Sequence, residues 1–186
     1  MTSYPEVLQS DETRAFWDYI QVLCAQARPP RAADFELMDI YNLASYVALV
    51  DLIPAEDRMR VRYVGTRIVE MFDQETTGKY LDELDIGPHT DELLDMYRKS
   101  FSEVRPHWSL ADVHMTRDEG YGYMRPITFS CERLMFPMVD EDGAVTRLAA
   151  VLSRQDRSSV LEEYVCEALD FPNGDKADDR PAASRV

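Results

Sequence analysis

The sequence predicts an α+β fold: a five-stranded antiparallel sheet with helices on one face and a further helix near each end of the chain. Three patterns along the 186 residues indicate it. Two strand patterns come early, a run of short helical patterns ending in a longer one follows, and three strand patterns come late. We divide the chain into an N-terminal helical extension (1–30), the sheet-containing domain (31–156), a C-terminal helix (157–170) and a disordered tail (171–186).

An amphipathic helix is expected first, from Asp11 to Ala27. Ser10 can serve as its N-cap, because a serine side chain accepts a hydrogen bond from the free amides of the first helical turn. The prolines at 29 and 30 end the helix. One face is apolar at helical spacing, and we expect it to be the docking or dimerisation surface: Phe16, Trp17, Ile20 and Leu23.

Two adjoining strands are expected next. The segment 46–53 is apolar at nearly every position, and the segment 58–63 alternates between an arginine and an apolar residue. A period of two places the arginines on one face of a strand and Met59, Val61 and Tyr63 on the other. The pair is therefore predicted to be an antiparallel hairpin whose second strand has one face in water.

Two glycines mark the place where the second strand leaves the sheet. Gly65 precedes the short helical segment 67–72, for which Thr66 is the expected cap, and Gly78 precedes a further turn. Because glycine adopts backbone conformations that side chains disfavour, we expect both glycines to act as structural pivots. A longer helix is expected to follow, from about Thr90 to Arg105.

The last two strands are predicted to form a hairpin around "DEDG", which ends in a strong turn pair. Both faces of this hairpin are apolar, so both must be covered. The middle helices cover one face, and the N-terminal helix or a second subunit is needed for the other. We expect a homodimer to form around the Phe16 face. One apolar set is Leu134, Phe136, Met138, Ala149 and Val151; the set expected to meet Phe16 is Met135, Pro137, Leu148 and Ala150.

Several ordered motifs resemble those of a family of short bacterial proteins, of an alphaproteobacterial type, that consist of one PAS-like domain. The motifs are "FWDYI", "PPRAADFELMDI", "RYVGTRIVEMF", "TTGKYLDEL" and "ERLMFPMVDEDG", and the resemblance covers Phe16 to Ser153. Two strands, a cluster of helices and three strands is also the order of a PAS domain. The resemblance implies a sensory or regulatory module that acts on other signalling proteins and can bind a small molecule.

No cofactor is identified, and neither haem nor flavin is expected. A haem-binding PAS domain needs an axial His on the long helix, and only His89 lies near the start of that helix. A flavin photosensor of the light-oxygen-voltage type carries a reactive Cys in an "NCRFLQ"-like motif, which the sequence lacks. No metal site is expected, because His107 and His114 fall on opposite faces of a strand.

Five aromatic residues are the candidates for a ligand site. Placed between the sheet and the long helix, they would either line a small-molecule pocket with polar rims or fill the core. These candidates are Tyr63, Tyr97, Phe101, Trp108 and Phe136.

Charge and cysteine content limit the partners that we expect. The 35 acidic and 20 basic residues give a formal net charge of −15, which disfavours nucleic acid and anionic membrane surfaces. The N-terminus has no signal-peptide pattern, and the apolar runs are too short for membrane insertion. We therefore expect a cytoplasmic protein in which Cys24, Cys131 and Cys166 are reduced thiols.

The alternative is a small enzyme of a cone-shaped α+β fold, similar to cyclases or isomerases. It would use an Asp or His in its pocket, for which Asp51, Asp112 and His114 are the candidates. The sequence contains no P-loop and no nucleophile-elbow or zinc-protease motif, so a non-catalytic role is expected. Asp51 lies within an apolar strand and is expected to pair with an arginine of the next strand, such as Arg60 or Arg62.

Overall fold

The computed structural model describes residues 4–84, 90–155 and 164–172. Its centre is a six-stranded antiparallel sheet with the strand order β2-β1-β5-β4-β3-β6. The predicted α+β fold with an antiparallel sheet is confirmed, with one strand more than the five expected. The strands are β1 (Val47–Ile53), β2 (Arg58–Val64), β3 (His107–Asp118), β4 (Met124–Val139), β5 (Val145–Gln155) and β6 (Val165–Ala168).

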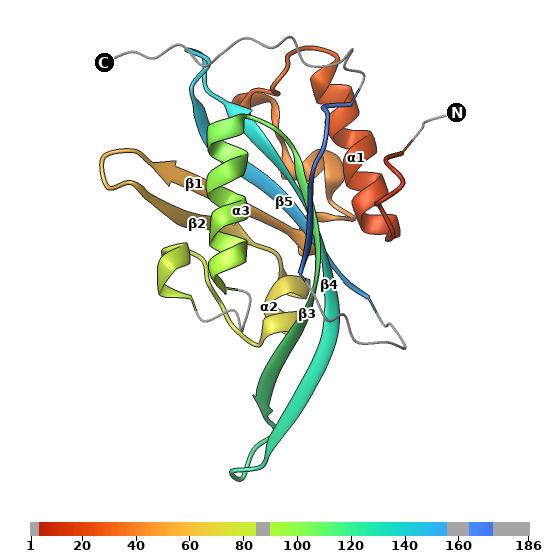
Figure 1. Cartoon of the computed structure of the whole chain (residues 1–186), viewed down its shortest axis with the longest axis vertical. Coiled ribbons are helices and arrows are strands. Elements are labelled where there is room, and N and C mark those ends of the chain that lie inside the picture. The colour runs from red at the N-terminus through yellow and green to blue at the C-terminus, as the bar shows by residue number, and fades with distance from the viewer. Residues whose placement is uncertain (1–3, 85–89, 156–163, 173–186) are drawn as a thin grey trace.

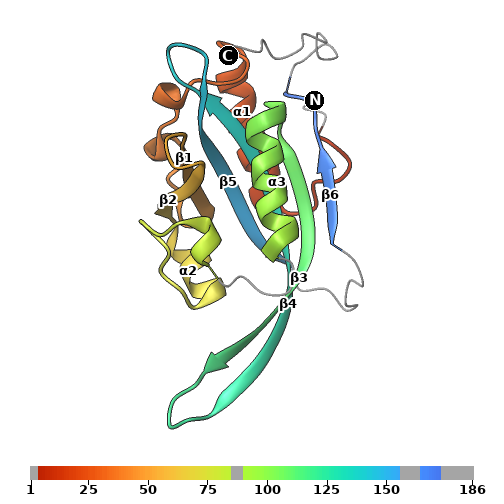
Figure 2. The same ribbon diagram turned by 60° about the vertical axis from the view of Figure 1, so that its left-hand side comes forward.

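Helices cover both faces of the sheet, as Figure 1 shows. In Figure 2, α3 lies in front of the sheet and α1 lies behind it. The Ser10 side chain caps α1 by accepting a hydrogen bond from the Thr13 amide at 3.1 Å, as expected. The helices are α1 (Asp11–Cys24), α2 (Thr66–Phe72) and α3 (Thr90–Glu103), and the shorter 3-10 turns are η1 (Ala32–Asp34), η2 (Leu37–Ile40), η3 (Ala44–Tyr46) and η4 (Leu81–Glu83).

Strand alternation divides the core into two clusters, one on each face. The β4–β5 hairpin has the expected register, with Leu134 opposite Val151 and Met135 opposite Ala150. The first pair packs in the cluster under α1 and the second in the cluster under α2 and α3. Phe16 of α1 is fully buried against the first set, with its ring centroid 5.9 Å from that of Phe136.

The docking surface of α1 therefore differs from the one that we expected. The helix covers the Leu134 set, whereas Met135, Leu148 and Ala150 lie under α3. Side chains of neighbouring strand residues point to opposite faces, so each set meets a different helix. Because the Phe16 face is buried within one chain, the argument for a homodimer around it does not hold.

The prediction of a C-terminal helix is wrong for the part of residues 157–170 that the structure describes. Val165 to Ala168 form β6, which pairs antiparallel with His107 to Leu110 of β3. The backbone groups at the edge of β3 need hydrogen-bond partners, and a short extended segment supplies them. The remaining predicted helix residues at 157–163 and the tail at 173–186 lie outside the described residues.

The two predicted pivot glycines are needed for different reasons. Gly78 has φ +84°, a conformation that other residues rarely adopt, and the space around it is open. Gly65 has φ −73°, so the expectation of an unusual backbone is wrong there. A side chain at Gly65 would instead place its Cβ 2.3 Å from the Ser45 carbonyl oxygen. Gly65 is also the N-cap of α2, a role that we had expected for Thr66.

The β3–β4 hairpin extends well beyond the rest of the sheet (Figure 1). Its tip exposes Tyr121, Tyr123 and Met124. No helix in the described part of the chain has the length and hydropathy needed to cross a lipid bilayer.

Candidate ligand-binding site

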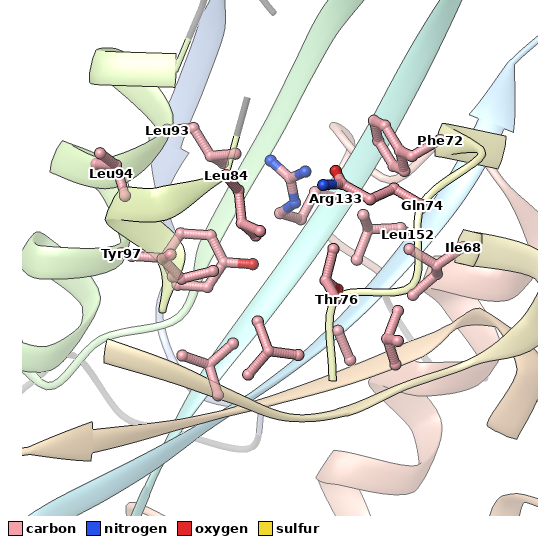
Figure 3. Close-up of a pocket in the computed structure, with 15 residues that line it drawn as sticks. Ile68, Phe72, Gln74, Thr76, Leu84, Leu93, Leu94, Tyr97, Arg133 and Leu152 are labelled. Atoms are coloured by element: carbon pink, nitrogen blue, oxygen red, sulfur yellow. The ribbon is translucent and has the colours of Figure 1, made fainter. Parts of the chain in front are cut away.

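A small pocket lies on the α3 face of the sheet (Figure 3), with a volume of about 60 Å³. Strand residues such as Val50 and Leu152 form its floor, while Ile68 of α2 and Leu93 of α3 form its sides. Eleven of its fifteen lining residues are apolar. The four others are Gln74, Thr76, Tyr97 and Arg133.

The segment after α2 brings two of these polar side chains over the sheet. The helix ends at Asp73, which has φ +53° and turns the chain away from the helix axis. Gly78 then reverses the chain, and its amide donates to the Val61 carbonyl of β2 at 2.7 Å. The Gln74 and Thr76 side chains, which lie between these two turns, therefore line the pocket.

Arg133 is the charged residue of the pocket. Its side chain leaves β4 at a central position of the sheet and is only 9% exposed. Its Nε is buried and has no hydrogen-bond partner. Within the described residues, no carboxylate forms an ion pair with this guanidinium, which has the Tyr97 ring as an aromatic neighbour at 6.0 Å. Figure 3 shows the guanidinium and the Gln74 amide pointing toward the same part of the pocket.

The titratable neighbours of Arg133 supply no negative charge near neutral pH. Burial raises the pKa of the Tyr97 hydroxyl and the pKa of the Cys131 thiol. Burial also raises the pKa of Tyr164 to about 12. All three groups therefore stay protonated at neutral pH, and the guanidinium, which does not lose its proton in proteins, remains a cation without a counter-charge from them.

The neighbouring residue on β4 has the opposite environment. Glu132 points to the α1 face and is fully buried. Its carboxylate accepts hydrogen bonds from the Trp108 indole at 2.8 Å and from the amides of Gln9 and Ser10 at 2.8 Å each. The Gln155 side-chain amide donates a fourth at 3.3 Å. This carboxylate joins the start of α1 to the sheet, and we assign it a structural role.

The five predicted aromatic site residues do not gather at one place. Tyr97 lines the pocket, and Phe101 packs in the same cluster without lining it. Trp108 and Phe136 lie on the α1 face, because even-numbered residues of β3 and β4 point to that side. Tyr63 also packs there, and its hydroxyl donates to the Ala44 carbonyl at 3.0 Å.

A β-bulge explains the position of Tyr63. Leu49 pairs with Tyr63, but the next residue, Val50, pairs with Val61, so Arg62 is an extra residue in β2. An extra residue reverses the faces on either side of it. The regular alternation that we predicted for β2 therefore stops at Arg62, and Tyr63 points away from the pocket.

Arg133 was missed at the sequence level, although a signal for it existed. It is one of two charged residues within the apolar stretch "SCERLMFPMV", and it shares its face with Met135. That face was expected to be covered by the helices that follow β2. A charged residue at a covered position of a central strand could therefore have been identified as a candidate.

The residues on which the enzyme alternative depended lie outside the pocket lining. Asp51 forms ion pairs with Arg147 at 2.7 Å and with Arg62 at 3.2 Å, the latter as expected. Asp112 is buried and accepts a hydrogen bond from the Ser130 hydroxyl. His114 is exposed, with its Nδ1 3.0 Å from the Thr128 hydroxyl. These residues share no site that could perform acid–base chemistry.

Metal-ligating residues are also scattered. His107 is buried, and its Nδ1 lies 2.8 Å from the Ser100 hydroxyl. Across residues 4–84, 90–155 and 164–172, no three His, Cys, Asp or Glu side chains are arranged to hold a metal ion.

Comparisons with known proteins concern the fold. No protein-family model matches the sequence, and no curated protein matches it. One similar solved structure is a light-oxygen-voltage domain studied with a flavin analogue; it is 16% identical, covers 68% of this chain and 89% of its own, and has a TM-score of 0.47. The dark structure of the Aureochrome1 LOV photoreceptor (15% identity, 67% and 86% coverage, TM-score 0.45) and the Rhodobacter sphaeroides LOV protein (12%, 67% and 70%, 0.41) are also similar.

These structures correct our expectation about flavin. We excluded flavin because a cysteine motif is missing, but the similar structures are light-oxygen-voltage domains, and one is described by its flavin analogue. The exclusion is therefore wrong. A flavin occupies more space than the cavity of about 60 Å³. The expectation about haem remains a prediction.

Proposed function

We propose that the protein is a non-catalytic sensory or regulatory module that binds a small molecule in the pocket under α3. Ligand binding would change the contacts of the module with other signalling proteins in the cytoplasm. The observation that supports this proposal is the buried Arg133, which has no counter-charge among the described residues and lies at the edge of a cavity with mostly apolar walls.

A plain structural core does not account for this arrangement. Buried polar groups in folded proteins almost always have hydrogen-bond partners, and a buried charge without one costs several kcal/mol. A core that only stabilises the fold would have an apolar residue at position 133, as it has at the neighbouring position Met135. A bound molecule that pairs with Arg133 would offset that cost.

The signalling partners of this module are also part of the proposal. The motifs in the sequence resemble those of bacterial single-domain PAS-like proteins, and the acidic surface disfavours nucleic acid. A homodimer, if one forms, must use a surface other than the Phe16 face. The exposed aromatic residues Tyr121 and Tyr123 at the tip of the β3–β4 hairpin are the surface that we assign to partner contact.

Native mass spectrometry of the protein purified from its own host tests the proposal. We expect a bound small molecule that is released on denaturation, and an absorption spectrum of the released molecule identifies a flavin if one is present. In a Thr76→Trp variant, the indole would fill the pocket and exclude the ligand. Thr77→Trp is the matched control, because Thr77 is exposed. Absence of any bound molecule, or equal occupancy in both variants, would contradict the proposal.

A further inference from the structure

Arg133 differs from the other arginines that pack near the sheet. Arg147 pairs with Asp51 at 2.7 Å, and Arg58 pairs with Asp82 at 2.8 Å and Glu83 at 2.7 Å. The chain has 35 acidic residues for 20 basic ones, so acidic partners are abundant. The described residues nevertheless place none of them within ion-pair distance of Arg133, the most buried of these cations.

The position of Arg133 leaves it only 9% exposed to solvent. It lies on β4 between Ser109 of β3 and Leu152 of β5, so strands flank it on both sides. Tyr97 of α3 lies above it. The N–H donors of this guanidinium therefore point into the pocket. The residues that line the pocket have neutral side chains apart from Arg133, and none of them is acidic.

We propose that Arg133 binds the carboxylate of a small apolar acid whose hydrocarbon part occupies the pocket. This inference rests on the proposed function and specifies the ligand class. The planar guanidinium matches a carboxylate through two parallel hydrogen bonds. The eleven apolar lining residues would contact the hydrocarbon part, for which the cavity of about 60 Å³ must widen, and the Gln74 amide can donate to the same carboxylate.

A carboxylate is favoured over a phosphate by the number of cations. Arg133 is the single cationic residue among those that line the pocket. A phosphate group carries between one and two negative charges and is usually bound by several cations or backbone amides. A carboxylate carries one charge, which one guanidinium neutralises, and it fits a smaller cavity.

Isothermal titration calorimetry with benzoate and its neutral analogue benzamide tests the inference on the full chain. We expect benzoate to bind about 10- to 100-fold more tightly than benzamide, since hydrogen bonds to a charged group discriminate by that factor. In Arg133→Met the ratio should fall to about one while benzamide binding persists. Arg133→Lys should retain part of the preference, because it keeps the charge and loses the planar fork.

Each other outcome overturns the inference. Equal binding of benzoate and benzamide to the wild-type protein means that no anion is recognised, although the pocket of the proposed function remains. If flavin mononucleotide binds in an Arg133-dependent way and benzoate is not preferred over benzamide, Arg133 recognises a phosphate and not a carboxylate. If neither benzoate nor benzamide binds, small apolar acids are rejected as the ligand class. Thermal melting shows that Arg133→Met is folded, and Thr76→Trp reports whether the pocket itself binds the probe.

Discussion

The two faces of the sheet differ in how the chain completes them, and two adjacent residues show the difference. Glu132 points under α1 and receives four hydrogen bonds from the chain itself. Arg133 points under α3, where its buried Nε has no hydrogen-bond partner and no described carboxylate forms an ion pair with it. Both are charged and buried in the same strand. The α1 face is therefore complete by itself, whereas the α3 face has a position for a group from outside.

Packing follows the same division. Under α1, aromatic rings contact one another closely, with centroid distances of 5.9 Å from Phe16 to Phe136 and 5.5 Å from Trp17 to Phe136. Under α3, the lining is mostly aliphatic and leaves a cavity of about 60 Å³. A buried polar group without a partner needs an explanation, and a bound molecule is the one that we propose for Arg133.

Removing an aromatic ring from the α1 face should have the largest effect. We expect Phe16→Ala to lower the free energy of unfolding by about 3–5 kcal/mol, because the ring is fully buried and its removal leaves a cavity. Urea denaturation measures the loss. Val22→Ala on the solvent side of the same helix is the control and should have little effect. A loss below about 1 kcal/mol for Phe16→Ala would mean that α1 is not part of the core.

Replacing the carboxylate of the same face should come next. In Glu132→Gln, an amide NH₂ would face donors, so at least one donor loses its acceptor, and we expect a loss of about 2–3 kcal/mol. The exposed Glu141→Gln is the matched control. If both variants unfold at the same urea concentration, Glu132 does not anchor α1.

The glycines at the entrance and exit of the pocket region should respond differently. Ala at Gly65 would overlap the Ser45 carbonyl, and overpacking against backbone costs about 1–3 kcal/mol. Ala at Gly78 meets open space but a left-handed backbone, which costs about 1 kcal/mol. Thermal melts of both variants should show the larger shift at Gly65. The reverse order would contradict the close approach of residues 44–45 to Gly65.

A buried histidine on the α3 side makes stability depend on pH. Burial lowers the pKa of His107 below its ordinary value of 6.5, so the unfolded chain takes up this proton more readily than the folded one. Stability should therefore fall as the pH decreases through and below 6.5. His107→Asn should reduce this part of the slope in denaturation midpoints measured across that range. An unchanged slope would mean that His107 titrates alike in both states.

The sequence predicted most of the fold because period and turns determine it. The hairpin at residues 140–143 defined the faces of β4 and β5 correctly, and Ser10 defined the start of α1. The prediction failed where pairing with a strand distant in the sequence determines the secondary structure. Val165 to Ala168 have the spacing of a helix, but the free edge of β3 makes them a strand.

The site was harder to predict than the fold. One bulged residue, Arg62, moved Tyr63 to the other face, and a bulge has no clear pattern in a regular alternation. Aromatic residues were selected for their size, but three of the five fill the α1 face. The informative residue was Arg133, because only the structure shows that its buried Nε has no hydrogen-bond partner and that no carboxylate of the described segments pairs with it.

Denaturation of Arg133→Met without ligand tests the difference between the faces most directly. If Arg133 is paired only by the anion of a bound ligand, the methionine removes an uncompensated buried charge from the ligand-free protein. The free energy of unfolding should then stay the same or rise by about 1–4 kcal/mol. The same urea titration is applied to Glu132→Gln, which should be destabilised. A loss for Arg133→Met as large as that for Glu132→Gln would show that the chain itself satisfies this guanidinium and would contradict the account.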